Sequence, residues 1–218
     1  MKIFLDTADT AAIDKHFKTG LIDGITTNPT LIMKSGRDPE EVYKEIADIG
    51  VKDISMEVVG GFQEMVKEGR RLSDKFGEVC TVKVPCTPEG LFVCHELKKS
   101  VIKVNVTLIF DVAQAILASK AGAAYVSPFV GRVDDNSFDG LELIRDIDEV
   151  FSNCNSCETK ILSASIRDVK SVSKSFANGA DIVTMPPTVF EKMYKHILTD
   201  RGLELFDQDW SEVKHLIT

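Results

Sequence analysis

Lys83 is the residue of this sequence whose type and surroundings point most directly to chemistry. It lies within the run Thr-Val-Lys-Val-Pro, between Val82 and Val84. Burial in such a run disfavours the charged form of an amine, and a neutral amine is a nucleophile toward carbonyl groups. The sequence therefore predicts a Schiff-base lysine. The alternative is a structural lysine that pairs with Asp6 or Glu57.

Asp6 and Glu57 are carboxylates within two other apolar runs. Schiff-base chemistry needs one group to move protons during carbinolamine dehydration and another to act on a substrate hydroxyl when a C–C bond breaks. Two carboxylates beside Lys83 are sufficient for both tasks. The structural alternatives are that Asp6 caps a first helix starting near Thr7, and that Glu57 only pairs with Lys83.

Arg132 and Arg167 follow two further apolar runs. Guanidinium groups bind phosphate in a bidentate manner and stay charged at every relevant pH. Arg167 also stands near Ser165 in a loop that leads toward a helix, whose N-terminus favours an anion. These residues predict a phosphate site, against the alternative of solvated surface arginines.

The elements that position these residues are eight short runs rich in β-branched residues. Most of the runs are nearly continuous in apolar residues, as expected of parallel strands covered by helices. They span residues 2–7, 23–27, 53–59, 80–86, 102–109, 123–130, 160–165 and 180–186.

Amphipathic stretches separate the runs, and we expect helices over 62–77 and 110–122, the second ending at Gly122. Gly179 is expected to end another helix, and Pro186 to close the last strand. Eight β/α units predict a (β/α)8 TIM barrel, whose reactive groups lie at the C-terminal ends of the strands. A doubly wound open sheet is the structural alternative, but no G-x-G-x-x-G follows the first strand.

No linker or low-complexity stretch divides the chain, so we expect one barrel domain over residues 1–218. The segment 202–217 is amphipathic and predicts one helix more than a barrel needs, within a C-terminal region 199–218. Phe206, Trp210, Val213 and Leu216 would share a face of it. This helix either covers a barrel end or docks on a neighbouring subunit.

The bulk composition excludes several classes of function. The net charge of −8 and the absence of a basic stripe argue against nucleic acid and anionic membranes as partners. No apolar run reaches the roughly 18 residues of a spanning helix, and the N-terminus does not read as a signal peptide. The five cysteines lack framework spacing, which indicates reduced thiols and a cytoplasmic protein. Cys154 and Cys157 form a C-x-x-C without a second pair, and we expect loop thiols and no metal site.

Seven motifs in order resemble the transaldolase family, and most closely its short branch, which includes the fructose-6-phosphate aldolases. GITTNP and SPFVGR are individually fairly specific, and the set is very specific. The motifs are FLDTAD (4–9), GITTNPTL (24–31), SMEVV (55–59), VKVP (82–85), NVTLIF (105–110), YVSPFVGR (125–132) and SASIR (163–167). FDQDW (206–210) also looks like the C-terminal helix of that branch.

The resemblance implies a (β/α)8 barrel that acts as a class I aldolase-type enzyme without metal or organic cofactor. It implies that Lys83 forms the Schiff base, that Asp6 is the general base, and that Glu57 and Thr107 hold a catalytic water. The implied substrate-binding residues are Asn28, Asn105 and Ser127 for the dihydroxyacetone fragment and Arg132, Ser165 and Arg167 for the phosphate, and we also expect Thr27 and Phe129 to bind substrate. The branch also implies a homo-oligomer, a pentamer or decamer.

Two activities occur in this branch, a transferase that keeps the enamine for an aldehyde acceptor and an aldolase that releases dihydroxyacetone. By resemblance, the aldolases carry glutamine at the position of Glu57, tyrosine at that of Phe129, and no asparagine at that of Asn105. The three residues here favour a transaldolase acting on phosphorylated sugars. The alternatives are the aldolase and a non-catalytic phosphosugar-binding barrel.

Overall fold

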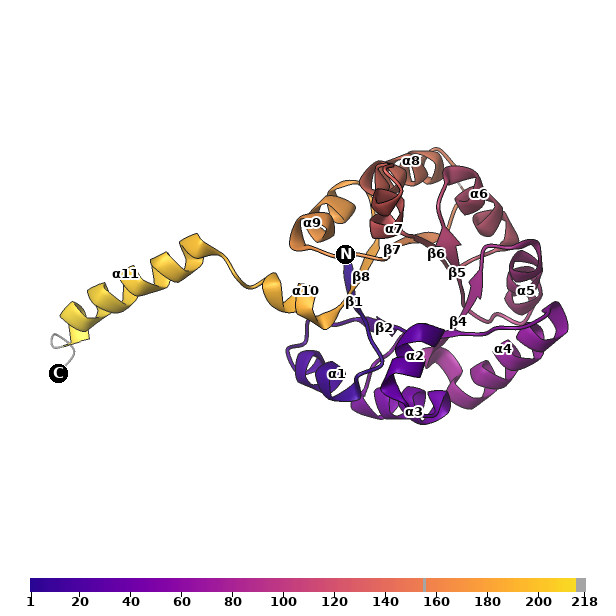
Figure 1. Cartoon of the computed structure of the whole chain (residues 1–218), viewed down its shortest axis with the longest axis horizontal. Helices are drawn as coiled ribbons and strands as arrows, with labels where there is room; N and C mark the ends of the chain where they lie inside the picture. The colour runs from indigo at the N-terminus through magenta and orange to yellow at the C-terminus, as the bar shows by residue number, and fades with distance from the viewer. Residues whose placement is uncertain (155, 215–218) are drawn as a thin grey trace.

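The computed structural model describes residues 1–154 and 156–214. Eight parallel strands form a closed barrel in which each strand pairs with its sequence neighbour and the last pairs with the first. The helices surround this barrel (Figure 1). The strands are β1 (Lys2–Asp6), β2 (Gly24–Thr26), β3 (Ile54–Glu57), β4 (Cys80–Pro85), β5 (Val104–Ile109), β6 (Tyr125–Pro128), β7 (Lys160–Ser163) and β8 (Ile182–Met185).

The predicted (β/α)8 barrel is confirmed, and each predicted run contains one strand. The predicted helices over 62–77 and 110–122 correspond to α4 and α6, and Gly122 ends α6 in the left-handed conformation. The helices are α1 (Thr10–Phe17), α2 (Pro29–Ser35), α3 (Pro39–Ile49), α4 (Phe62–Phe76), α5 (Pro88–Lys99), α6 (Val112–Ala121), α7 (Val130–Asp135), α8 (Gly140–Ser152), α9 (Val169–Ala177), α10 (Pro187–Lys192) and α11 (Ile197–Val213).

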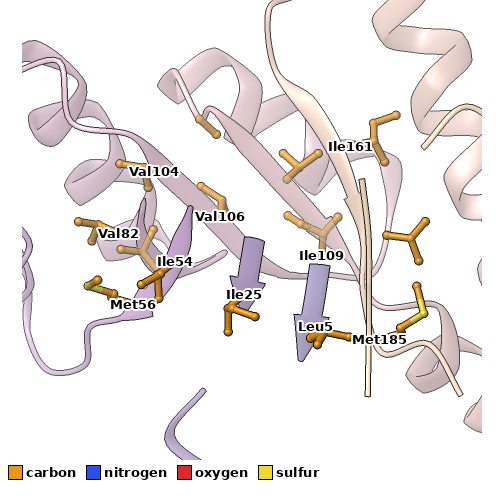
Figure 2. Packing of buried hydrophobic residues seen from close by; sticks show 14 of the residues in the cluster. Leu5, Ile25, Ile54, Met56, Val82, Val104, Val106, Ile109, Ile161 and Met185 are labelled. Atoms are coloured by element: carbon orange, nitrogen blue, oxygen red, sulfur yellow. The ribbon is translucent and has the colours of Figure 1, made fainter. Parts of the chain in front are cut away.

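The alternation of side chains along each strand divides the core into two layers. Outward-facing residues such as Leu5, Ile25 and Val82 pack beneath the helices in one continuous apolar layer (Figure 2). Inward-facing residues include a second, small apolar cluster around Phe4, which is fully buried. A Cβ on Gly24 would lie 2.5 Å from the Phe4 ring, so the glycine leaves room for the aromatic filling of the barrel.

A buried polar cluster closes the N-terminal end of the barrel. The Asp53 carboxylate accepts hydrogen bonds from Thr81 Oγ1 at 2.8 Å and from the Tyr125 hydroxyl at 2.7 Å. Lys103 Nζ lies 3.4 Å from the same carboxylate. Burial, together with the neighbouring Asp53 charge, raises the pKa of Tyr125 and keeps its hydroxyl a donor. Asp53, Thr81, Lys103 and Tyr125 are called the base cluster below.

The C-terminal helix α11 leaves the barrel and runs outward as an arm (Figure 1). It has no buried residue, and Phe206 and Trp210 are 71% and 59% exposed. The expectation that this helix covers a barrel end is therefore wrong for the described residues, because none of its apolar side chains reaches the barrel core. It begins at Ile197, five residues before the predicted 202, and Leu216 lies outside the described residues.

Candidate active site

A cavity of about 290 Å³ opens at the C-terminal ends of the strands. Its wall is formed by residues from all eight strands or the loops that follow them, as the barrel architecture predicts for a reactive site. The lining residues are Asp6, Thr26, Asn28, Pro29, Thr30, Glu57, Lys83, Thr107, Leu108, Ser127, Phe129, Arg132, Leu162, Ala164, Ser165 and Thr184.

Lys83 is one of these lining residues and is buried, with 5% of its surface exposed. Its Nζ donates to the main-chain oxygen of Thr27 at 2.9 Å and lies 2.9 Å from Glu57 Oε2. The β3–β4 register places Glu57 directly beside Lys83. A proton can therefore pass between amine and carboxylate, and the pairing that defines the structural alternative is equally the geometry that proton transfer needs.

Asp6 lies at the end of β1 and accepts a hydrogen bond from Thr26 Oγ1 at 2.8 Å. Thr26 Oγ1 in turn lies 2.7 Å from Thr184 Oγ1 on β8. Burial raises the pKa of Asp6, and the Thr26 hydrogen bond and the Lys83 charge oppose that shift in part. A carboxylate with a raised pKa is a stronger base, so the site suits Asp6 for removing a hydroxyl proton.

Asp6 does not cap the first helix, and that alternative is wrong. Asp9 caps α1 instead, accepting hydrogen bonds from the main-chain nitrogens of Ala11 and Ala12. Helix α1 begins at Thr10, after a turn that carries the chain out of β1. The Asp6 side chain consequently faces the cavity.

Asn105 lies one layer below the cavity and is fully buried. Its Oδ1 accepts from Ser127 Oγ at 2.7 Å, and its Nδ2 donates to Ser55 Oγ at 3.2 Å. The amide therefore links β3, β5 and β6 beneath Lys83. Asn105 does not line the cavity, but its hydrogen-bond partner Ser127 does.

Thr107 occupies an irregularity in β5 where the pairing with β6 shifts between Val106 and Ile109. Leu108, the next residue, has φ of 60°, a left-handed conformation that is costly for a side chain with a Cβ. The bulge lets Thr107 and Leu108 both line the cavity. Among residues 1–154 and 156–214, Thr107 Oγ1 is the buried side-chain oxygen or nitrogen without a hydrogen-bond partner. A buried hydroxyl at a cavity wall without a partner indicates a position for water or substrate.

The part of the cavity wall after β6 and β7 holds Arg132 and Ser165, two of the groups predicted to bind phosphate. The Arg132 guanidinium stacks over the Phe129 ring at 4.7 Å and lines the cavity. Ser165 lines it as well, with φ of 59°. Arg167 is not part of the cavity wall, and its guanidinium pairs with Asp135 at the end of α7.

The structure thus brings most of the predicted residues to one cavity and leaves three outside its wall. Those three are Thr27, Asn105 and Arg167. The side chain of Thr27 is buried against the Ser55 carbonyl, and it is its main-chain oxygen that meets Lys83. Asn28 lines the cavity while its Oδ1 caps α2 through the Leu31 nitrogen.

Sequence reasoning missed Thr184 and Leu108 as cavity residues. Thr184 carries a recognisable signal, since it is a polar residue inside the apolar run of β8, just as Lys83 is in β4. Leu108 carries none, because its position depends on the bulge in β5.

The C-x-x-C thiols lie in the connection between α8 and β7, away from the cavity wall. Cys154 is exposed and Cys157 is half-buried, and neither forms a disulfide. In the described parts of the chain, no cluster of three or more His, Cys, Asp or Glu side chains is arranged to hold a metal ion. Likewise, no described helix combines the length and apolar character needed to cross a membrane.

Comparison with known proteins identifies the family of this chain. Residues 3–217 match the sequence profile described as Transaldolase/Fructose-6-phosphate aldolase. The chain belongs to this family. A relative from Paracoccus denitrificans, named a probable transaldolase, is 51% identical over 97% of both chains. Probable transaldolases of Nitrosopumilus maritimus and Aquifex aeolicus are each 50% identical, over 98% of this chain.

Solved structures extend the likeness of the fold beyond the family. A mandelate oxidase superposes with a TM-score of 0.60 over 84% of this chain, at 18% sequence identity. The chain spans 62% of the length of that protein. At this identity the likeness shows the barrel alone.

Proposed function

We propose that the protein is a transaldolase that moves a dihydroxyacetone unit between phosphorylated sugars through a Schiff base on Lys83. The observation that supports it most is the buried Lys83 amine at the cavity wall, 2.9 Å from Glu57 and sharing the cavity with the unpartnered Thr107 hydroxyl. The donors are fructose 6-phosphate or sedoheptulose 7-phosphate. The acceptors are erythrose 4-phosphate or glyceraldehyde 3-phosphate.

The first half-reaction begins when Lys83 passes a proton to Glu57 and the neutral amine adds to the ketose C2 carbonyl. Glu57 returns the proton to the carbinolamine hydroxyl, water leaves, and an iminium forms. The Thr107 hydroxyl holds this water, which matches its free hydrogen-bonding capacity in the cavity wall. Asp6 then removes the C4 hydroxyl proton, the C3–C4 bond breaks, and its electrons flow into the iminium to give an enamine.

The second half-reaction reverses these steps with a new aldehyde. The first aldose phosphate leaves, the acceptor enters, and the enamine carbon attacks its carbonyl. Protonated Asp6 returns the proton to the new C4 oxygen, and water releases the product from Lys83. One site used twice predicts ping-pong kinetics. Parallel initial-velocity lines are expected, and intersecting lines would indicate a ternary complex.

Transfer is favoured over release by the residues around the enamine. Phe129 provides no hydroxyl to place a water or proton there. Glu57 and Asn105 are two of the residues by which the sequence resembles the transaldolases of the branch rather than its aldolases. The second candidate is a fructose-6-phosphate aldolase with the same cavity, in which the enamine is protonated and dihydroxyacetone is released.

The proposal includes an assembly, a cytoplasmic location and a single barrel unit for the whole chain. The exposed apolar face of α11, with Phe206 and Trp210, supports a homo-oligomer in which this arm contacts a neighbouring copy. Removing residues 197–218 is expected to dissociate the pentamer or decamer. Sedimentation of the truncated chain as an oligomer with the same number of subunits as the full chain would refute this role of the arm.

The function is tested by incubating the protein with fructose 6-phosphate and borohydride, then mapping the adduct by mass spectrometry. A reduced dihydroxyacetone adduct on Lys83, absent from Lys83→Met, is expected. Erythrose 4-phosphate should discharge the unreduced intermediate to sedoheptulose 7-phosphate, whereas an aldolase would release dihydroxyacetone without it. A folded protein that forms no adduct would leave the non-catalytic phosphosugar-binding barrel as the better explanation.

A further inference from the structure

Arg167 and Asp135 form a two-point ion pair at the rim of the cavity. Both terminal nitrogens of the guanidinium donate to the two carboxylate oxygens. The two side chains are about half exposed, at 54% and 49%. Arg167 stays outside the cavity wall, while Arg132, on the same helix as Asp135, lines it.

The stem of Arg167 crosses the rim next to this wall. A Cβ on Gly131 would lie 2.8 Å from Arg167 Nε and 2.4 Å from the Ser165 carbonyl oxygen. The main-chain nitrogens of Val130 and Gly131 donate to Ala164 and Ser165, which fixes the start of α7 against the loop after β7. Arg167 therefore leaves a rigid rim, and its guanidinium is held by Asp135 at the far end of the same short helix.

Opposite charges meet at this rim, where Arg167 pairs with Asp135. The Arg167 guanidinium lowers the pKa of Asp135, and the Arg132 charge lowers it further to a smaller extent. Asp135 thus stays ionised at neutral pH and occupies the face of Arg167 that a planar or tetrahedral oxyanion would bind.

We propose that Asp135 holds Arg167 outside the cavity wall, and that a substrate phosphate displaces Asp135 from Arg167 whereas an uncharged sugar does not. Asp135 is then a specificity-determining residue that acts through Arg167. The inference deepens the proposed function, on which it rests, by naming how a phosphorylated substrate is distinguished from a free sugar.

The physical basis is a competition between two anions for one guanidinium. A phosphate dianion carries more charge and more acceptor oxygens than a carboxylate, so it can replace Asp135 at Arg167. A sugar hydroxyl cannot. Because an exposed ion pair is weak, the competition reduces phosphate affinity only about two- to five-fold.

The test replaces Asp135 by asparagine, which keeps the shape and removes the charge. Calorimetric titration with inorganic phosphate should give a Kd about two- to five-fold lower in Asp135→Asn, and the KM for fructose 6-phosphate should fall by a similar factor. The kcat/KM for unphosphorylated fructose should be unchanged. Glu149→Gln, at an exposed position of α8, removes the same charge and should change none of these values.

A second background separates action through Arg167 from simple repulsion between Asp135 and the phosphate. In Arg167→Gln, the further change Asp135→Asn should leave the phosphate Kd unaltered. A tighter Kd that persists in this background would overturn the proposal, because it would show repulsion through space. Weaker phosphate binding in Asp135→Asn would overturn it too, because Asp135 would then be orienting Arg167 for the ligand.

The calorimetric titration with phosphate requires no turnover, so its result does not depend on whether the proposed reaction takes place. Phosphate binding with the expected Asp135 dependence, but without transfer activity, would refute the transaldolase function and keep the competition. Transfer activity in which Asp135→Asn affects fructose and fructose 6-phosphate equally would keep the transaldolase function and refute the competition.

Discussion

Two polar clusters lie inside the same barrel, the base cluster at its N-terminal end and the cavity wall at its C-terminal end. In the base cluster, Asp53 has partners for both carboxylate oxygens, and no cavity residue belongs to it. At the other end, the Thr107 hydroxyl has no partner among the described residues, and an opening of about 290 Å³ separates the polar groups. Closed hydrogen bonding stabilises a fold, whereas open capacity is what a ligand can use.

Substitution of Asp6 in the cavity wall is expected to have the largest effect. Asp6→Asn should lower kcat about 10²- to 10⁴-fold, because in the proposed reaction the C4 hydroxyl then loses its proton acceptor. Burial raises the folded-state pKa of Asp6, so its ionised form subtracts from stability as the pH rises from the ordinary value of 3.8 through the folded value. The Tm of Asp6→Asn at neutral pH should therefore equal or exceed that of the parent. A clear fall in Tm would place Asp6 with the structural cluster.

The corresponding carboxylate of the base cluster should behave in the opposite way. Asp53→Ala leaves the buried Thr81 and Tyr125 hydroxyls without acceptors and Lys103 without its charge partner. We expect a loss of about 2–4 kcal/mol in the free energy of unfolding, measured by urea denaturation. The kcat of the folded fraction should stay within about two-fold of the parent. A large loss of kcat at unchanged stability would contradict the assignment of the base cluster to stability alone.

Two threonines give the closest matched pair. Thr107→Val keeps the shape and deletes an unpartnered hydroxyl, so kcat should fall about ten- to hundred-fold while stability is retained. Thr81→Val deletes a donor to buried Asp53, so stability should fall about 1–2 kcal/mol while kcat is retained. Urea denaturation and steady-state assays on both variants would show whether a hydroxyl without a hydrogen-bond partner serves catalysis and one with a partner serves stability.

The smallest expected effect concerns the fate of the enamine. Phe129→Tyr adds a hydroxyl at the cavity wall and should raise the fraction of turnovers that release dihydroxyacetone, by a few-fold. Phe110→Tyr is the matched control, since the Phe110 ring centroid lies 5.8 Å from that of Phe129 and Phe110 does not line the cavity. Unchanged partitioning in Phe129→Tyr would show that this position does not choose between transfer and release.

Much of this arrangement follows from sequence pattern because a barrel strand buries both faces. Glu57, Lys83 and Thr107 are polar residues in apolar runs, and the barrel brings such residues to one mouth. Thr184 and Ser55 are also polar residues within apolar runs, so the sequence pattern marks them in the same way. Patterns within one run carry no information on contacts between distant segments, so the Arg167–Asp135 pair and the outward course of α11 required the structure. The β5 bulge has no sequence signature either, because leucine rarely adopts positive φ.

The pairing of β1 with β8 also determines when the barrel can close as the chain is synthesised. Lys2 pairs with Ile182 and Leu5 with Met185, so the first strand made must wait for the last. Thr184 arrives with that final strand and completes the hydroxyl chain to Thr26 and Asp6. A nascent chain whose β3 and β4 have paired can therefore hold Lys83 beside Glu57 before Asp6 has its full set of neighbours. Catalytic competence should appear only when the barrel seam closes, which makes enzyme activity a reporter of the last step of folding.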